Sequence, residues 1–362
     1  MSKWQGFQHG MGIGGWLTNY KRFNVLPETM RDVTIGDMEH FASYITERDV
    51  AYIASLGMDH IRLGFDQIVL EETPYTYRAV ILDKIEEFLG WCRKYQLNVV
   101  LNLHKSIGNY CDIQETRELL DDAELQDRFV ALWVMLEKRY AAYPAVAFEL
   151  LNELRDCDPE KWNVLATRTV EAIRTLNATR PIVIGSTRWN SVTTVKDLKI
   201  FDDPGVIYTF HMYEPFGFTH QRGVLQKYPC YYNREMPYPC AIERYRDYLH
   251  AVKGTQNAYA EYDRMDARFV ESYLQPAVDF CKAHPDKILW LGEFGSIRHA
   301  KIEWRENYMR DVIRFCKKND IPYCVWNYLS TPYDGNRFSL VDDDHRRILS
   351  DEMARIIRGE VE

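Results

Sequence analysis

Two glutamates that end apolar runs are the residues of this sequence best placed to do chemistry. Residues 147–151 form a largely apolar run that stops at Asn152 and Glu153, and residues 288–292 form a second run that stops at Glu293. Short apolar runs are typical of buried strands, and in barrels of parallel strands the carboxyl ends meet at the face that holds the active site. Two glutamates that meet there are what glycosidic bond cleavage by a pair of carboxyl groups requires.

Eight such runs alternate along the chain with stretches in which apolar residues recur at helical spacing. The runs are residues 10–15, 60–64, 98–103, 146–151, 182–185, 206–210, 288–291 and 323–326. Helical spacing is clearest in residues 81–92, 125–136, 162–176 and 308–315. Apolar strands that alternate with helices indicate a parallel sheet, and eight units predict an α/β fold, a closed (β/α)8 TIM barrel. The alternative is an open, doubly wound sheet.

One connection is much longer than the others. Residues 214–264, after the sixth predicted strand, are rich in Tyr, Phe and Pro. Long loops in compact domains usually carry function or structure of their own. We predict a single catalytic domain over residues 1–362, with 214–264 as an insertion on the carboxyl-terminal face that forms one wall of a cleft. A solvated decoration without a role is the alternative.

The composition excludes several classes of function. The formal net charge is −8 and no basic block stands out, so nucleic acid is not an expected partner. There is neither a signal peptide after Met1 nor an apolar run long enough to span a bilayer, so we expect a cytoplasmic monomer that binds no membrane. A secreted protein would be expected if a leader had been removed.

Cysteine usage and glycine spacing give no sign of a metal or cofactor. The eight Cys form no C-x-x-C pair, and His9 lacks the His-x-His partner of metal-dependent barrels. Residues 12–15 lack the spacing of a phosphate-binding loop, so no cofactor is expected. We interpret Cys92, Cys281, Cys316 and Cys324 as small buried hydrophobes. Cys230 and Cys240 are interpreted as reduced, with a bridge between them as the alternative in a secreted protein.

Polar or aromatic residues recur at or just beyond the predicted strand ends. They are Arg62, His104, Asn152, Glu153, His211, Tyr213, Glu293 and Trp326. Each is weak evidence alone, but the ends of barrel strands converge, and together they predict a site. Glu149 shares its strand face with Glu153, and we predict a buried residue that needs a cationic or hydrogen-bonding partner.

The order of these motifs resembles glycoside hydrolase family 5. The resemblance is carried by residues 14–17 (GGWL), 60–63 (HIRL), 101–104 (LNLH), 148–153 (FELLNE), 210–213 (FHMY), 291–295 (LGEFG) and 325–327 (VWN). Within the family the chain is most similar to clostridial endoglucanases without a signal peptide, which carry a subdomain after strand six. Leu154 stands where many members have Pro.

The resemblance implies a role for each residue. Glu153 would be the acid/base and Glu293 the nucleophile of a retaining hydrolysis, with their carboxyl groups about 5 to 5.5 Å apart. The negative charge of Glu293 would raise the pKa of Glu153. The remaining matches are Arg62 and Tyr213 as holders of the nucleophile, Asn152 as the contact to the sugar 2-hydroxyl, His104 and His211 as subsite ligands, and Trp326 as a platform under the sugar.

The predicted function is therefore an endo-β-1,4-glucanase that acts on cellulosic or mixed-linkage β-glucan. Mannan, xylan or xyloglucan cleavage by the same machinery, and exo action as a β-glucosidase or β-1,3-glucanase, remain alternatives. More distant ones are a carbohydrate-binding barrel without catalysis and a metal-dependent amidohydrolase. Trp16, Trp189 and the aromatic residues of 214–264 are candidates either for further subsites or for packing.

Overall fold

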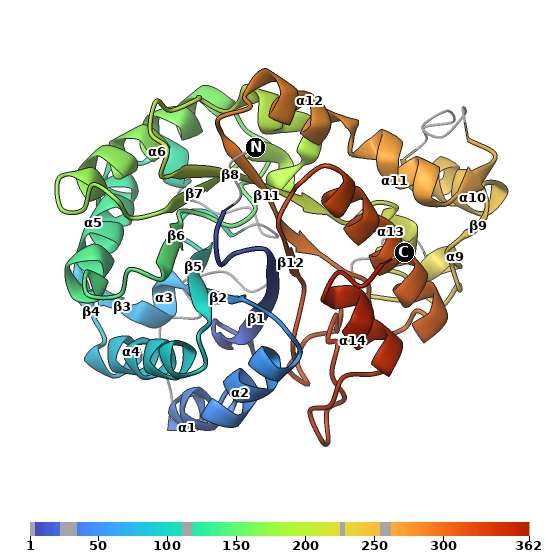
Figure 1. Ribbon diagram of the computed structural model, residues 1–362. Coiled ribbons are helices and arrows are strands. Elements are labelled where there is room, and N and C mark those ends of the chain that lie inside the picture. The colour runs from blue at the N-terminus through green and yellow to red at the C-terminus, as the bar shows by residue number, and fades with distance from the viewer. Residues whose placement is uncertain (1–3, 22–34, 111–117, 225–228, 254–261, 362) are drawn as a thin grey trace.

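A closed barrel of eight parallel strands forms the centre of the molecule (Figure 1). The computed structural model describes residues 4–21, 35–110, 118–224, 229–253 and 262–361. In barrel order, which is also chain order, the strands are β1 (His9–Leu17), β2 (His60–Asp66), β5 (Asn98–Lys105), β6 (Val146–Glu149), β7 (Ile182–Gly185), β8 (Val206–Met212), β11 (Ile288–Phe294) and β12 (Tyr323–Val325). All eight predicted strands are confirmed, and the open sheet is excluded because β1 pairs with both β2 and β12.

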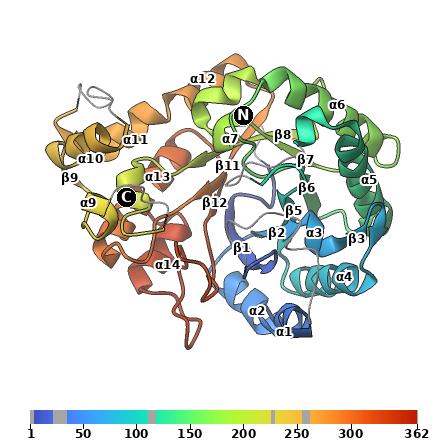
Figure 2. The ribbon, with the colours of Figure 1, turned by 180° about the vertical axis from the view of Figure 1, so that it is seen from behind.

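Helices surround the strands on the outside (Figures 1 and 2). They include α1 (Ile35–Ser43), α2 (Glu47–Ser55), α4 (Ala79–Lys94), α5 (Ala123–Tyr140), α6 (Pro159–Arg174), α12 (Gln275–Ala283), α13 (Ile302–Lys318) and α14 (Asp351–Ile357). Side chains fix the starts of several: for example, Asp122 accepts N–H groups of the first turn of α5, and Asp158 does so for α6. The predicted apolar faces are buried, except that Leu176 lies beyond the end of α6 and is exposed.

Further elements lie in the connections between the strands. They are α3 (Gln67–Leu70), β3 (Glu71–Thr73), β4 (Thr76–Tyr77), η2 (Leu119–Asp121), α7 (Thr187–Asn190), η3 (Val192–Asp197), α8 (Phe216–Thr219), α9 (Pro229–Tyr232), β9 (Cys240–Ala241), α10 (Glu243–Lys253), β10 (Arg264–Met265) and α11 (Ala267–Tyr273).

The long connection after β8 carries α8, α9, α10 and the antiparallel pair β9 and β10. In both ribbon views α9, β9 and α10 lie at one edge of the molecule, next to α11 and α13. Tyr231, Tyr245 and Tyr248 are buried, and the buried Tyr238 donates to Asp311 of α13 at 2.8 Å. These tyrosines therefore pack the segment against the barrel, and the idea that they form sugar subsites is wrong. Tyr228 lies outside the described residues.

Aromatic residues close the amino-terminal end of the barrel. Trp4 stacks on Phe7, with ring centroids 4.1 Å apart, and meets the edge of Trp290 at 5.6 Å. These rings pack with side chains near the starts of the strands, namely Val100, Ala147, Val183, Ile207 and Cys324. Among the described residues this end is filled by apolar groups, which favours the approach of a substrate from the other end.

Six cysteines of the described residues are free thiols. Cys92, Cys316 and Cys324 are buried as predicted, whereas Cys281 is only half-buried and packs against the margin of the core. Cys240 is unbridged, and the side chain of Cys230 lies outside the described residues. No described helix is long and apolar enough to cross a membrane.

Candidate active site

The carboxyl ends of the strands bring the two predicted glutamates together. Glu293 lies next to the last residue of β11, and in the strand register it is the partner of His211 on β8. Glu153 follows β6 by four residues, in a loop where its own φ is +40°. One carboxylate oxygen from each glutamate and a ring nitrogen of His211 all lie within 4.8 Å of one another. This separation fits a retaining pair and is too short for the water that an inverting pair must admit.

Two donors hold Glu293 in place. The Arg62 guanidinium donates through Nη1 to Oε1, and the Tyr213 hydroxyl donates to Oε2 at 2.8 Å. Burial would raise the pKa of Glu293, but the positive charge of Arg62 and the hydrogen bond from Tyr213 oppose this and help to hold the pKa below its ordinary value. Glu293 is therefore ionised at neutral pH and held in one orientation.

Glu149 and Asn152 in turn hold Arg62 in place. It is fully buried, and its Nε and Nη2 donate to the two oxygens of Glu149 at 2.6 and 2.8 Å. Nη2 also donates to Oδ1 of Asn152 at 2.7 Å. The bidentate geometry fixes the plane of the guanidinium. The prediction that Glu149 is buried with a cationic partner is confirmed, and the partner is Arg62.

Glu153 has different surroundings from Glu293. Its side chain keeps about a fifth of its surface exposed, at 19%, and Oε1 lies 2.9 Å from Nδ1 of His211. Burial raises the pKa of Glu153 above its ordinary value, with the charge of Glu293 adding to the effect and the His211 hydrogen bond opposing it. The predicted direction agrees with this result, but the predicted main cause was wrong, because loss of hydration ranks above repulsion between the carboxylates.

Trp326 and His104 form the aromatic part of the site. Their rings are nearly parallel, 5.4 Å apart at the centroids, and both are partly exposed. A Cβ on Gly12 or Gly14 of β1 would come within 2.6 Å of the Trp326 ring, so these glycines let the indole lie against the strand. Burial lowers the pKa of His104 to about 3, which keeps this ring neutral at ordinary pH.

Comparison with known proteins agrees with this geometry. Residues 26–331 match the cellulase family, glycosyl hydrolase family 5. The chain is 33% identical to Endoglucanase C of Acetivibrio thermocellus, and the match covers 97% of this chain and 98% of that protein. The chain belongs to glycosyl hydrolase family 5.

Two further similarities extend the comparison. Cellodextrinase A of Ruminococcus flavefaciens is 32% identical over 61% of this chain and 62% of its own length. The structure of Thermotoga maritima Cel5A in complex with cellobiose superimposes with a TM-score of 0.71, at 22% identity, and covers 97% of both chains. The latter likeness supports the barrel fold of this family 5 protein.

Trp16 and Trp189, which the sequence left open between sugar subsites and packing, have opposite surroundings. Trp16 is fully buried and donates from Nε1 to the carbonyl of Phe41 at 2.9 Å, so the idea of a sugar subsite at this residue is wrong. Trp189 lies in α7, just after β7, and 48% of its surface is exposed. It stays a candidate for contact with substrate in this family 5 protein.

Sequence reasoning missed Asn190 and Asn102 as supports of the two histidines. Nδ2 of Asn190 lies 3.2 Å from Nε2 of His211, and Oδ1 of Asn102 lies 3.0 Å from Nδ1 of His104. Asn102 occurs in the strand motif before His104, and strand parity could have placed both on one face. No comparable pattern in the sequence indicated Asn190. Its position depends on a turn with positive φ values, and no glycine marks that turn in the sequence.

The donor set of Glu153, His211 and Glu293 would also suit a divalent metal. Both oxygens of Glu293 already accept hydrogen bonds, and the Arg62 guanidinium brings a positive charge to one of them. A second cation would meet repulsion there. The arrangement therefore favours a pair of carboxyl groups that act as acid and nucleophile over metal binding.

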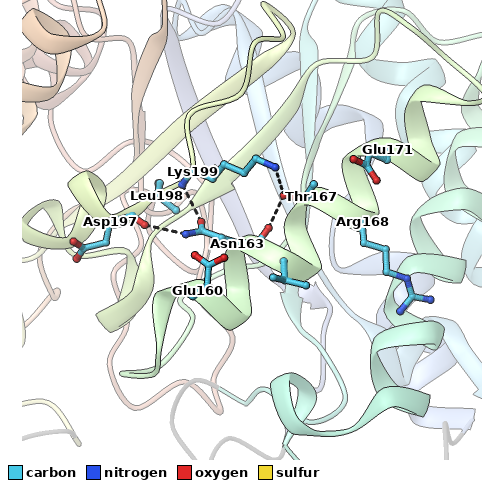
Figure 3. A pocket seen from close by; sticks show the side chains of 9 residues that line it. Glu160, Asn163, Thr167, Arg168, Glu171, Asp197, Leu198 and Lys199 are labelled. Atoms are coloured by element: carbon cyan, nitrogen blue, oxygen red, sulfur yellow. Dashed lines mark hydrogen bonds between the residues drawn. The ribbon is translucent and has the colours of Figure 1, made fainter.

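A depression of about 650 Å³ on the outer surface is separate from this site. It is lined by residues of α6 and by residues at and just after the end of η3, among them Asn163, Thr167 and Lys199 (Figure 3). Asn163 bonds to the backbone of Asp197 and Lys199, and Lys199 donates to Thr167 at 3.1 Å. These groups bond to one another and include none of the predicted site residues, so the depression is a feature of helix packing.

Proposed function

We propose that this family 5 protein is an endo-β-1,4-glucanase that cleaves β-glucan with retention of configuration. The observation that carries the proposal is the short distance between the carboxylates of Glu153 and Glu293, with one held ionised and the other favoured in its protonated form. A pair with pKa values pushed apart in this way supports Glu153 as the acid and Glu293 as the nucleophile.

In the first step Glu293 attacks the anomeric carbon and forms a covalent glycosyl ester. Glu153 gives its proton to the glycosidic oxygen, so the departing chain leaves as a neutral alcohol. Tyr213 and Arg62 hold the attacking carboxylate at a fixed angle, which reduces the entropy lost on reaching the transition state. The raised pKa of Glu153 supports its role as donor.

In the second step water replaces the departed chain. Once Glu293 is esterified its negative charge is gone, so the pKa of Glu153 falls and the carboxylate can accept a proton from that water. Attack of the water on the anomeric carbon breaks the ester and releases a sugar with the original configuration. Glu293 returns as a carboxylate between Arg62 and Tyr213.

Substrate contacts follow from the exposed parts of the site. The Trp326 face suits the apolar C–H face of a sugar ring, and neutral His104 beside it can bond hydroxyl groups. Because Oδ1 of Asn152 accepts from Arg62, its amide N–H groups are directed elsewhere, which suits a contact to the sugar 2-hydroxyl. The relatives named endoglucanase favour an internal cut in a glucan.

Proton NMR during hydrolysis of a cello-oligosaccharide tests the mechanism. A retaining enzyme first releases β-anomeric products, which later mutarotate. First release of the α-anomer would contradict the double displacement, while no hydrolysis of any glycan would contradict the function.

A substrate panel tests the specificity. We expect a rapid fall in the viscosity of carboxymethylcellulose or barley β-glucan, with mixed oligosaccharides as products. Faster cleavage of mannan, xylan or xyloglucan would reassign the substrate. Release of glucose alone, with little change in viscosity, would instead indicate exo action.

A further inference from the structure

The turn after β7 has an unusual backbone. Arg188, Trp189 and Asn190 have φ values of +54°, +56° and +54°. Side chains disfavour this left-handed region, and Asn tolerates it better than Arg or Trp. Such strain persists only where surrounding contacts fix it, and it often marks functional sites.

The turn is bonded to the loop that carries Glu153. The Trp189 N–H donates to the carbonyl of Leu154 at 2.8 Å, and the Arg188 N–H donates to that of Arg155 at 3.3 Å. Leu154 directly follows Glu153. The turn and the loop therefore fix each other, and the turn cannot move without moving the acid.

Asn190 directs its side chain inward from this turn. It is fully buried and occupies space that a side chain at Gly185 would fill, since a Cβ there would lie 2.3 Å from its Oδ1. Its Nδ2 lies 3.2 Å from Nε2 of His211. His211 therefore stands between the amide of Asn190 and the carboxyl of Glu153.

The neighbours of His211 indicate where its proton lies. Nδ1 faces two acceptors, Oε1 of Glu153 at 2.9 Å and Oε2 of Glu293 at 3.6 Å. This nitrogen therefore carries a hydrogen. A neutral imidazole has one donor and one acceptor nitrogen, so Nε2 is then an acceptor and needs a donor. The amide of Asn190 supplies one.

We propose that Asn190 is a positioning residue: by donating to Nε2 of His211 it keeps this imidazole neutral, with its one proton on Nδ1 and directed at Glu153. The inference rests on the proposed function of Glu153 as acid/base. Oε1 of Glu153 then accepts a hydrogen bond at all times, so the acid proton is placed on Oε2, the oxygen left for the leaving group. A cationic His211 would instead favour ionised Glu153 and deprive the acid of its proton.

Other charged or titratable groups face His211 and are common to wild type and variants. They are Glu153 after β6, Glu293 of β11, Tyr213 after β8, Arg62 of β2 and His104 of β5. Because these groups stay in place, a change confined to position 190 isolates the effect of the amide.

The substitution Asn190→Asp tests the proposal through a pH profile. A carboxylate cannot donate to Nε2, so it should draw a second proton onto His211, and the nearby imidazolium should lower the pKa of Glu153. We expect the alkaline limb of kcat/KM on cello-oligosaccharides to move down by about one pH unit. An unchanged or raised limb in a folded variant would overturn the proposal. Arg188→Gln is the matched control: it makes the same change in charge in the same turn, on an exposed side chain, and should leave the limb in place.

Histidine-selective ¹⁵N NMR of the wild-type protein keeps the test independent of whether the variant folds. His211, assigned by comparison with His211→Gln, should show a neutral ring with its proton on Nδ1 at pH 7. A proton on Nε2, alone or together with Nδ1, would overturn the proposal. An active wild type with either result would leave the proposed glucanase function intact, whereas an inactive wild type would count against that function itself.

Discussion

The two ends of the barrel are built from the same strands but hold opposite kinds of side chain. β2 carries His60 at its start and Arg62 two residues later, and β11 carries Trp290 near its start and Glu293 near its end. Aromatic packing fills the closed end, whereas buried ions and their hydrogen bonds fill the open end. Apolar packing stabilises the fold, while buried charges contribute little net stability and are retained for what they do.

Substitution of the proposed nucleophile should separate activity from stability most clearly. Glu293→Gln removes the attacking charge, and we expect hydrolysis of an aryl cellobioside to fall by about a thousandfold or more. Stability should change little, because Arg62 keeps its bidentate contact with Glu149. Initial rates and thermal melting measure the two effects.

A buried glutamate outside the site provides the control. Glu137 pairs with Arg180 on the outer side of the barrel, and both side chains are 1% exposed. Glu137→Gln should lower stability and leave the rate nearly unchanged. Activity within tenfold of wild type for Glu293→Gln would remove Glu293 from its proposed role.

Arg62 links function and stability at the open end. Arg62→Met leaves Glu149 and Glu293 as buried charges without their cation, and we expect a loss of about 3 to 5 kcal/mol in the free energy of unfolding, measured by urea denaturation. The double variant Arg62→Met, Glu149→Leu should recover part of that stability but none of the activity. A single variant as stable as wild type would contradict the proposed role of the ion cluster.

The sequence predicted the open end better than the closed end, for a physical reason. Strand ends of a parallel barrel must converge, so polar residues such as His211 and Glu293 at those ends could be assigned to one site before any coordinates. No periodic pattern connects Trp4 to Trp290, so the aromatic closure could not be predicted. Burial is also a tertiary property, which explains why the sequence left Trp16 open between a subsite and packing and why the predicted main cause of the raised pKa of Glu153 was wrong.

The closed end should affect stability without affecting catalysis. Trp4→Ala removes a ring that stacks on Phe7 and contacts Trp290, and we expect a loss of about 3 kcal/mol in the free energy of unfolding. The kcat should stay within twofold of wild type at a temperature where the variant is folded. Tyr232→Ala, at a tyrosine that is 48% exposed, is the control and should cost much less. A large fall in kcat for Trp4→Ala would show that the two ends are coupled.

A charged group at the closed end, Asp59, should give the smallest effect. The Asp59 carboxylate accepts the N–H groups of Gln8 and His9 at 2.7 and 3.0 Å, and it lies 2.7 Å from Nδ1 of His60. Burial opposes ionisation, but these hydrogen bonds, led by that of His60, lower the pKa of Asp59 below its ordinary value of 3.8. A lowered pKa in the folded state means that this group stabilises the protein above pH 3.8 and that the contribution is lost as the pH falls through the lowered value.

Asp59→Asn should therefore cost about 1 kcal/mol at pH 7, and this difference from wild type should shrink as the pH falls toward 3. Urea denaturation at several pH values measures it, with Asp83→Asn, at an exposed carboxylate that pairs with Arg139, as the control with little effect at any pH. A difference that stays constant with pH would mean that Asp59 acts through its shape and neutral hydrogen bonds. In that case the charge of Asp59 would add nothing to the packing of the closed end, and the buried charges that matter to this barrel would be those of the Glu137–Arg180 pair and of the active site.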